Sequence, residues 1–262
     1  MTSSLPRDVS AQTVLVTAGA SGIGWAIARR FLTVGARVAL CDVDANALDR
    51  ACEEQPLLLA GVVDVSDETQ VDAFVTAVKS ELGPVDTLVN NAGIAGGCAP
   101  IATLGMEDWR RSFNVNVHGC FSFLRAVTPD MEQRGGGAVI NISTGSVFTL
   151  PVNRLDYIAS KWAVEGLTRG AAKELGPAGI RVNAIRPGLV DGPRMQAILQ
   201  AQADSKGVPL AHIEAGFLDF ISMRAKVQPH EIADLAVFLA SPAARHITGQ
   251  LIGVDGNIEW EQ

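Results

Sequence analysis

Residues 12–24 read Gln-Thr-Val-Leu-Val-Thr-Ala-Gly-Ala-Ser-Gly-Ile-Gly. The first half of this stretch is short and β-branched, which is typical of a buried strand. The glycine-rich second half opens a helix that is predicted to run to about Val34. A strand, a glycine turn and a helix in this order let the backbone and the helix N-terminus approach a pyrophosphate. A tight turn without a ligand fits the same residues, so the stretch predicts an α/β fold and leaves a nucleotide site as a hypothesis.

A carboxylate follows the second predicted strand, residues 36–41. Asp42 comes eighteen residues after Gly24, close to the spacing of about 20 at which an acid bonds a ribose 2′-hydroxyl. A carboxylate at this place would also repel a 2′-phosphate, so we expect NAD rather than NADP. Asp42 could instead cap a helix over residues 44–53, and the two roles are compatible.

Strand-like and helix-like segments then alternate along the chain. The segment 192–226 breaks the alternation with helix-like residues of mixed polarity, and an insertion after a strand's carboxyl end is a natural substrate cover. No linker or repeat interrupts the chain, which predicts one domain over residues 1–262. Further strands are expected at residues 57–63, 85–89, 138–142, 180–185 and 250–254, and further helices at about 67–82, 105–134, 157–176 and 231–239.

Composition restricts the classes of function. The formal net charge is -7, which argues against a nucleic-acid partner. Apolar runs such as residues 56–63 are far shorter than the ~20 residues of a membrane span. The 4 cysteines and 4 histidines are scattered without metal-ligand spacing, which fits a reducing cytoplasm and predicts no metal site. We therefore expect a cytoplasmic protein that acts on a small molecule.

Tyr157 and Lys161 are four residues apart in a helical pattern, so they lie on one face, one turn apart. A fixed ammonium group favours the phenolate form, and such a pair can move a proton to or from an alcohol oxygen near neutral pH. Asn90-Asn91-Ala92-Gly93 and Ser143-Thr144-Gly145-Ser146 each follow a predicted strand, at the edge where open α/β sheets bind ligands. For Asn114 and His118, inside the 105–134 helix, we expect bonds between helices.

Taken together, these motifs resemble the short-chain dehydrogenase/reductase family over nearly the whole chain. The resemblance rests on the order and spacing of the glycine turn, Asp64-Val65, Asn90-Asn91-Ala92-Gly93, Asn116-x-x-Gly119-x-Phe121, Tyr157-x-x-x-Lys161, Val182-Asn183, Pro187-Gly188 and Val254-Asp255-Gly256. It implies a Rossmann-type, doubly wound, seven-stranded parallel sheet, usually in homotetramers. It also implies hydride transfer between a nicotinamide and a carbonyl or alcohol carbon.

The family's roles are expected at matching positions. The resemblance makes Tyr157 the acid and base, Lys161 its activating partner on the nicotinamide ribose, and Asn116 the holder of a water on a proton path. A hydroxyl after the fifth strand polarises the substrate oxygen. Cofactor contacts are expected from Ala18, Ala20, Ser21, Gly22, Ile23, Asp42, Val43, Asp64, Val65, Asn91, Ala92, Gly93, Tyr157, Lys161, Pro187, Gly188 and Val190.

Three positions depart from the family pattern. Ala18 stands where the first turn glycine is expected, and we expect its φ to remain negative so that an alanine is tolerated. Thr144 occupies the place of the catalytic serine, although a shift of one residue would give the role to Ser143. Gly192 replaces a threonine that often bonds the cofactor's carboxamide, so that amide needs another partner.

The leading hypothesis is an NAD-dependent dehydrogenase of a secondary alcohol, with a sugar or polyol as the preferred substrate. Gly97, Ser146, Asn153, Arg154 and Arg194 are candidate substrate residues, although charged loop residues are commonly just solvated. The alternative enzyme is a 3-ketoacyl-thioester or ketosteroid reductase, which would need a more apolar 192–226 cover. The alternative from another class is a sensor or scaffold that binds NAD without catalysis.

Overall fold

The computed structural model describes residues 8–258, in which seven parallel strands form one sheet. The strand order is β3-β2-β1-β4-β5-β6-β7, so the direction of winding reverses between β1 and β4. This order confirms the predicted doubly wound sheet and puts the expected ligand crevice beyond the carboxyl ends of β1 and β4. The strands are β1 Thr13–Thr17, β2 Arg37–Asp42, β3 Leu59–Val62, β4 Thr87–Asn90, β5 Gly137–Ile142, β6 Ile180–Pro187 and β7 Leu251–Val254.

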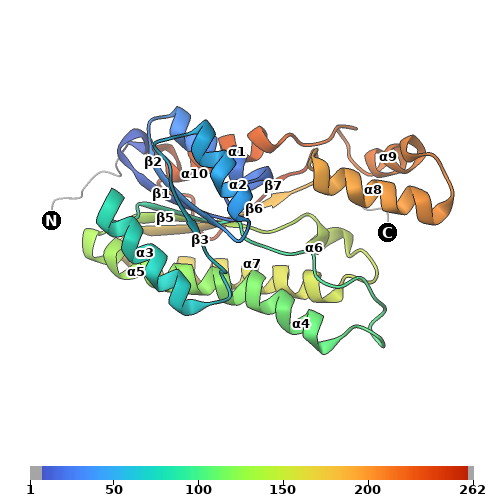
Figure 1. Cartoon of the computed structure of the whole chain (residues 1–262), viewed down its shortest axis with the longest axis horizontal. Coiled ribbons are helices and arrows are strands. Elements are labelled where there is room, and N and C mark those ends of the chain that lie inside the picture. Colours follow the sequence, from blue (N-terminus) through green and yellow to red (C-terminus); the bar gives the residue numbers. More distant parts are fainter. Residues whose placement is uncertain (1–7, 259–262) are drawn as a thin grey trace.

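Helices cover both faces of the sheet (Figure 1). Val14 and Val16 of β1 pack into the hydrophobic core on one face, whereas Leu15 between them packs into the core on the other. This alternation is the period of two that a strand buried on both faces requires. One face carries α1 Gly22–Thr33, α2 Ala45–Glu54 and α10 Pro229–Ala240, and the other carries α3 Glu68–Leu82, α5 Gly119–Arg134 and α7 Leu155–Leu175.

The helix predicted over residues 105–134 is continuous but irregular. It consists of α4 Met106–Phe113, a π-helical turn Asn114–His118, and α5. Asn116 in the turn is buried, whereas Asn114 and His118 are exposed. Our expectation that these two outer residues bond between helices was therefore wrong, because the wider turn directs only the middle residue inward.

The segment 192–226 forms a helical hairpin that extends beyond the sheet (Figure 1). Its helices are α8 Pro193–Lys206 and α9 Leu210–Asp219, joined by a small core of Leu199, Ala203 and Ile213. Lys226 bridges Glu214 of α9 and Asp191, which follows β6. The hairpin is thus a separately packed unit attached at the carboxyl end of β6.

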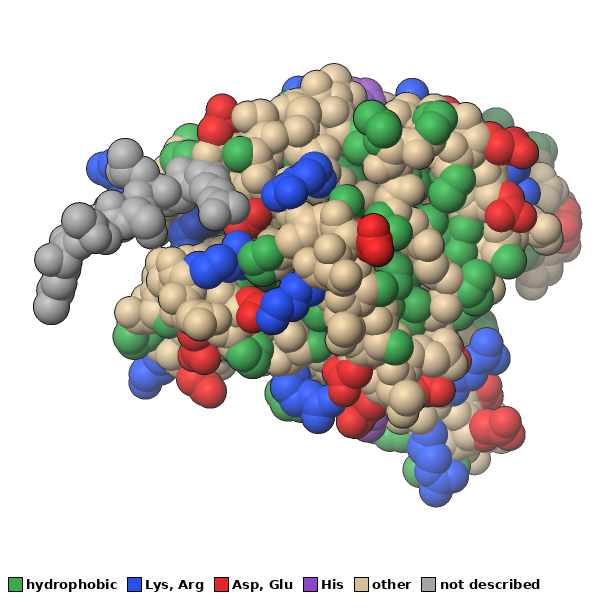
Figure 2. Space-filling model, turned by 60° about the vertical axis from the view of Figure 1, so that its left-hand side comes forward, with side chains coloured by type: hydrophobic (Ala, Val, Ile, Leu, Met, Phe, Trp, Pro, Cys, Tyr) green, Lys and Arg blue, Asp and Glu red, His purple; other side chains and the backbone are tan. Residues whose placement is uncertain are grey.

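Figure 2 shows acidic and basic side chains interspersed over one face of the molecule. Within residues 8–258, no helix has the length and apolar character to cross a membrane. In the same part of the chain, no three His, Cys, Asp or Glu side chains come together as a metal site would need.

Candidate active site

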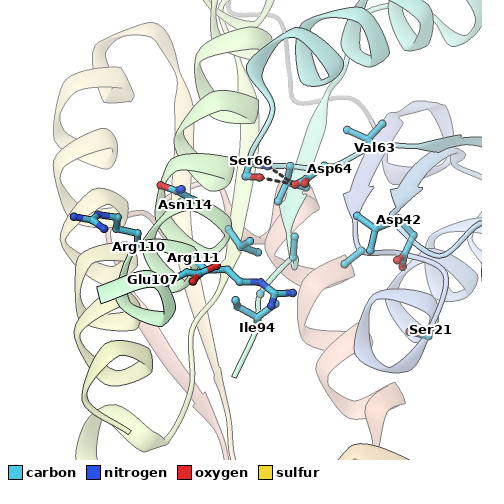
Figure 3. A pocket seen from close by; sticks show the side chains of 16 residues that line it. Ser21, Asp42, Val63, Asp64, Ser66, Ile94, Glu107, Arg110, Arg111 and Asn114 are labelled. Carbon is cyan, nitrogen blue, oxygen red and sulfur yellow. Dashed lines mark hydrogen bonds between the residues drawn. The ribbon is translucent and has the colours of Figure 1, made fainter. Parts of the chain in front are cut away.

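A cavity of about 750 Å³ lies at the carboxyl ends of β1 and β4, where the strand order reverses. Figure 3 shows Ser21 and Asp42 on one side and Glu107, Arg110 and Arg111 of α4 on the other. Its volume is in the range of cofactor sites. Eight of the predicted cofactor residues line it, namely Ala18, Ser21, Asp42, Val43, Asp64, Val65, Ala92 and Gly93.

The glycine turn is built for close approach of backbone segments. A Cβ atom on Gly24 would lie 2.2 Å from the carbonyl oxygen of Ala18 and 2.5 Å from the side-chain nitrogen of Asn91, so only glycine fits there. Ala18 itself has a φ of 47°. The expected negative φ was wrong, because the close packing under Gly24 fixes a left-handed conformation that costs an alanine free energy.

Asp42 turns back toward the glycine turn. Its carboxylate accepts bonds from the backbone N–H of Ala20 at 3.2 Å and of Asp44 at 3.2 Å. The cap of α2 is Asp44, whose carboxylate accepts from Ala47 at 3.1 Å. The alternative role of Asp42 as the cap of this helix is therefore wrong, and its carboxylate stands at the cavity wall.

Side-chain bonds tie the ends of β1 and β4 together. The Thr17 hydroxyl accepts from the backbone N–H of Asn91 at 3.0 Å and of Ala92 at 2.9 Å. The Asn91 side chain donates to the carbonyls of Thr17 at 3.0 Å and Ala18 at 2.9 Å. Asn91 therefore holds the glycine turn in place. It is not among the residues that line the cavity.

The other edge of the cavity is also ordered by local bonds. The Asp64 carboxylate accepts from the backbone N–H and the hydroxyl of Ser66 at 2.9 and 2.6 Å, as Figure 3 shows. Asp67 caps the next helix, α3, because its carboxylate accepts from the backbone N–H groups of Thr69 and Gln70.

Asn116 links the π-helical turn to the catalytic helix and to the cavity. Its amide donates to the Ser160 hydroxyl at 2.9 Å and to the Ile94 carbonyl at 3.1 Å, and its oxygen accepts from the Ile94 N–H at 2.8 Å. Ser160 in turn donates to the Tyr157 carbonyl at 2.8 Å. Asn116 therefore fixes both α7 and the strand-end loop that lines the cavity.

Lys161 lies near residues of both cavities, although neither it nor Tyr157 is among the residues that line them. Lys161 is 4% exposed, and its Nζ donates to the carbonyl of Ile142 at 2.7 Å. A Cβ atom on Gly93 would lie 3.1 Å from this Nζ, and Gly93 lines the first cavity. Ile142 ends β5, two residues before Thr144, which lines the second cavity.

Tyr157 is half-buried in the first turn of α7, one turn before Lys161. The Arg154 guanidinium carbon lies 5.2 Å from the centre of its ring, within the range of a cation–π contact. Arg154, a candidate substrate residue, thus packs against the phenol.

The two candidate catalytic hydroxyls point to different surroundings. Ser143 donates to the carboxylate of Glu165 at 2.7 Å, and Glu165 is paired with Arg186. Thr144 accepts from the Ser146 N–H at 3.1 Å and lines the second cavity together with Ser146. Of the two, Thr144 is therefore the hydroxyl that a substrate can reach.

The second cavity has a volume of about 450 Å³ and lies between the ends of β5 and β6 and the helical hairpin. Pro187 and Gly188, two predicted cofactor residues, line it at the β6 end. The hairpin contributes Met195, Gln202, Lys206, His212, Ile213, Gly216 and Phe217, and the segment after it contributes Phe220 and Ile221.

The remaining predicted residues lie outside these linings. Ala20, Gly22 and Ile23 belong to the glycine turn, where Gly22 has a φ of 54°. Val190 pairs with Val227 in a β-bridge. Among the substrate candidates, the Gly97 N–H donates to Asp156 at 2.8 Å and the carbonyl of exposed Asn153 accepts from Ala99. The side chain of Arg194 is outside the described part of the chain.

Several residues at the cavities were not singled out from the sequence. Ile94, Glu107, Arg110 and Arg111 line the first cavity. The i, i+3 and i+4 spacing of 107, 110, 111, 114 and 115 places them on one helix face, which is a signal that could have found them. The apolar lining from α9 has no such local signal.

Comparison with known proteins gives a consistent set of similarities. A family model described as enoyl-(acyl carrier protein) reductase matches residues 17–257. The 7alpha-hydroxysteroid dehydrogenase of Escherichia coli (strain K12) is 34% identical over 246 residues, which is 92% of each chain. The crystal structure of an NAD+-bound xylitol dehydrogenase has a TM-score of 0.89 at 30% identity, covering 95% of this chain and 100% of the other. That of an actinorhodin polyketide ketoreductase variant with NADPH has a TM-score of 0.89 at 33% identity, covering 95% and 97%.

Proposed function

Because this chain belongs to the short-chain dehydrogenase/reductase family, we propose that it transfers a hydride between NAD(H) and a secondary alcohol or ketone, with Tyr157 as the acid and base. The observation that supports this most directly is the position of Lys161 near residues of both cavities. One cavity fits a dinucleotide, and the other offers the Thr144 hydroxyl to a substrate.

In the oxidising direction, the Tyr157 phenolate takes the proton of the substrate hydroxyl. The carbinol carbon then loses its hydrogen as a hydride, and a ketone forms. NAD⁺, when bound, supplies the hydride acceptor. Lys161 stabilises the phenolate, and Thr144 donates a hydrogen bond to the substrate oxygen as its charge develops.

The bonds around Asn116 support the positioning role that the family resemblance implies for it. Asn116 connects Ser160, the Tyr157 backbone and the strand-end loop at Ile94. We assign to it the positioning of α7 against the cofactor cavity and the holding of a water next to Lys161.

Asp42 supports the preference for NAD. Its carboxylate is held at the cavity wall by two backbone N–H groups. A ribose 2′-hydroxyl can donate to it, whereas a 2′-phosphate would meet like charge. In Asp42→Ala, the ratio of kcat/KM with NAD⁺ to that with NADP⁺ should fall by about tenfold, since like charges at such a site cost on the order of 1–2 kcal/mol. An unchanged ratio would remove Asp42 from this role.

The test of the activity is Tyr157→Phe. General acid–base catalysis contributes on the order of 10²–10⁴ in rate, so turnover should fall by about a thousandfold while NADH still binds, as measured by its fluorescence. A variant with wild-type turnover would end the assignment. NADH binding without turnover of any alcohol or ketone by the wild-type protein would favour the sensor or scaffold instead.

The lining of the second cavity supports one substrate class over another. A sugar or polyol needs many hydrogen-bond partners. The hairpin offers Gln202, Lys206 and His212 as polar side chains, but Met195, Ile213 and Phe217 give the cavity an apolar stretch. An apolar cover is what a ketosteroid or 3-ketoacyl-thioester reductase needs. It favours an alcohol with an apolar body over the sugar or polyol that we preferred from the sequence. The homotetramer and the cytoplasmic location stay predictions, the first of which light scattering would test.

A further inference from the structure

We infer that the substrate of this site has an elongated apolar body that carries an anionic group at the end remote from the reacting carbon. This inference rests on the proposed function and adds the substrate class to it. It comes from the distribution of side chains along the second cavity.

The cavity has a polar catalytic end. Thr144, Ser146 and Thr149 line it there, next to Pro187 and Gly188 at the end of β6. These hydroxyls suit a single alcohol or carbonyl oxygen. The reacting carbon of the substrate therefore belongs at this end.

The middle of the cavity is largely apolar. Met195 of α8, Ile213 and Phe217 of α9, and Leu189 and Ile221 line it, with Gln202 of α8 as the polar exception. Burying apolar area stabilises a bound ligand by roughly 25 cal/mol per Å², whereas each polyol hydroxyl left without a partner here would cost free energy. The body of the ligand is therefore hydrocarbon.

The far end of the cavity is cationic. Met195 lies in the first turn of α8 and Lys206 at its last residue. Eleven residues of helix span about 16 Å at 1.5 Å each. Lys206 and His212 lie on either side of the turn between α8 and α9, and both line the cavity.

No carboxylate lines this cavity among the described side chains, and Lys206 and His212 are its ionisable groups. The chain as a whole has a net charge of -7. A cavity lined by two basic groups and no carboxylate therefore differs in charge from the rest of the chain. An ammonium group and an imidazole N–H are both donors that suit a carboxylate. The charge complementarity points to an anion at this end.

The experiment compares three alcohols with NAD⁺ in steady state: 11-hydroxydodecanoate, its methyl ester, and xylitol. The first two share an apolar chain and a secondary alcohol and differ in the remote charge. Lys206 and His212 are both exposed, and one contact at such a site contributes less than about fivefold in affinity. Two such contacts together are worth about tenfold in affinity. The carboxylate should therefore have a KM about tenfold below that of the ester at similar kcat, and xylitol should be the poorest substrate.

Variants locate the effect. Lys206→Gln and the double variant with His212→Gln should raise the KM of the carboxylate toward that of the ester and leave the ester unchanged. Lys173→Gln, an exposed lysine in the last turn of α7, is the matched control and should change neither. Equal losses for carboxylate and ester would show a structural effect of Lys206 and overturn the proposal. So would an ester or xylitol that is as good a substrate as the carboxylate.

Binding to the Tyr157→Phe variant separates this inference from the proposed function. Calorimetry with 11-oxododecanoate and its methyl ester, in the presence of NADH, measures the cavity without turnover. If Tyr157→Phe binds the carboxylate ten times more tightly than the ester but the wild-type protein turns over neither alcohol, the inferred substrate class is supported and the proposed reaction is refuted. If the wild-type protein turns over the alcohols but neither assay shows a preference for the carboxylate over the ester, the proposed reaction is supported and the inferred substrate class is refuted.

Discussion

Glu165 is the buried acid whose replacement should destabilise this protein most clearly. Its side chain is 2% exposed and accepts three hydrogen bonds, from Ser143 Oγ at 2.7 Å, Arg186 Nε at 2.7 Å and Arg186 Nη2 at 2.6 Å. The Arg186 guanidinium also lies 4.2 Å from the centre of the Phe148 ring. This group of residues joins β5, α7 and β6 next to the site.

The substitution Glu165→Gln keeps the shape of the side chain and removes its charge. Arg186 is 9% exposed, so the change leaves a buried cation without its counter-ion, which costs about 3–5 kcal/mol. The glutamine oxygen can still accept one bond, so we expect about 3 kcal/mol. For a chain of this size, that corresponds to a melting temperature lower by about 6–12 °C.

The assay is urea unfolding followed by circular dichroism, with unchanged m-values as the check for two-state behaviour. Glu54→Gln is the control, because Glu54 is 45% exposed and pairs with Arg29 at 3.2 Å, and such surface pairs contribute less than about 1 kcal/mol. Replacing both members, as Glu165→Leu with Arg186→Met, should cost less than Glu165→Gln alone. Equal losses in Glu165→Gln and Glu54→Gln would refute the reasoning.

The site and its surroundings are open to three further tests. Thr144→Ala should lower kcat/KM by on the order of a hundredfold, as expected for loss of a donor to the reacting oxygen, whereas Ser143→Ala should change it only a few-fold; the reverse result in steady-state assays would exchange the two roles. Ala18→Gly should raise the free energy of unfolding by up to about 1 kcal/mol in urea, because glycine adopts the positive φ without strain; a loss of stability would contradict the observed backbone. Burial raises the pKa of Cys41 and of Cys120 to about 12, so at pH 8 both remain thiols and should react with Ellman's reagent only after urea is added, and their rapid reaction in the native protein would contradict this.

The sequence predicted those parts of the protein that depend on neighbours along the chain. The short, β-branched apolar run of β1, the glycines at the turn, and the Tyr157 and Lys161 pair are all local patterns. Asn116 was found by its place in a motif. In each case the physical requirement lies within a few residues, so the pattern alone expresses it.

What the sequence did not predict depends on residues far away in the chain. The φ of Ala18 is set by packing under Gly24 and Asn91, and the direction of Ser143 by Glu165. The mixed polarity of residues 192–226 gave no indication of which side faces the substrate. That became visible only once α8 and α9 packed around Leu199 and Ile213.

The π-helical turn at Asn114–His118 also has a consequence for any variant that shortens the chain between α4 and α5. In this turn the Gly119 N–H bonds the carbonyl of Asn114, five residues back, which accommodates one residue more than a regular helix would hold. Removing a single residue here would restore regular helical geometry and, because the wide turn already absorbs that residue, would leave α4 and α5 close to their present orientation. The wide turn that directs Asn116 toward Ser160 and Ile94 would be lost, so the more regular helix would belong to a protein without this link between α7 and the cavity.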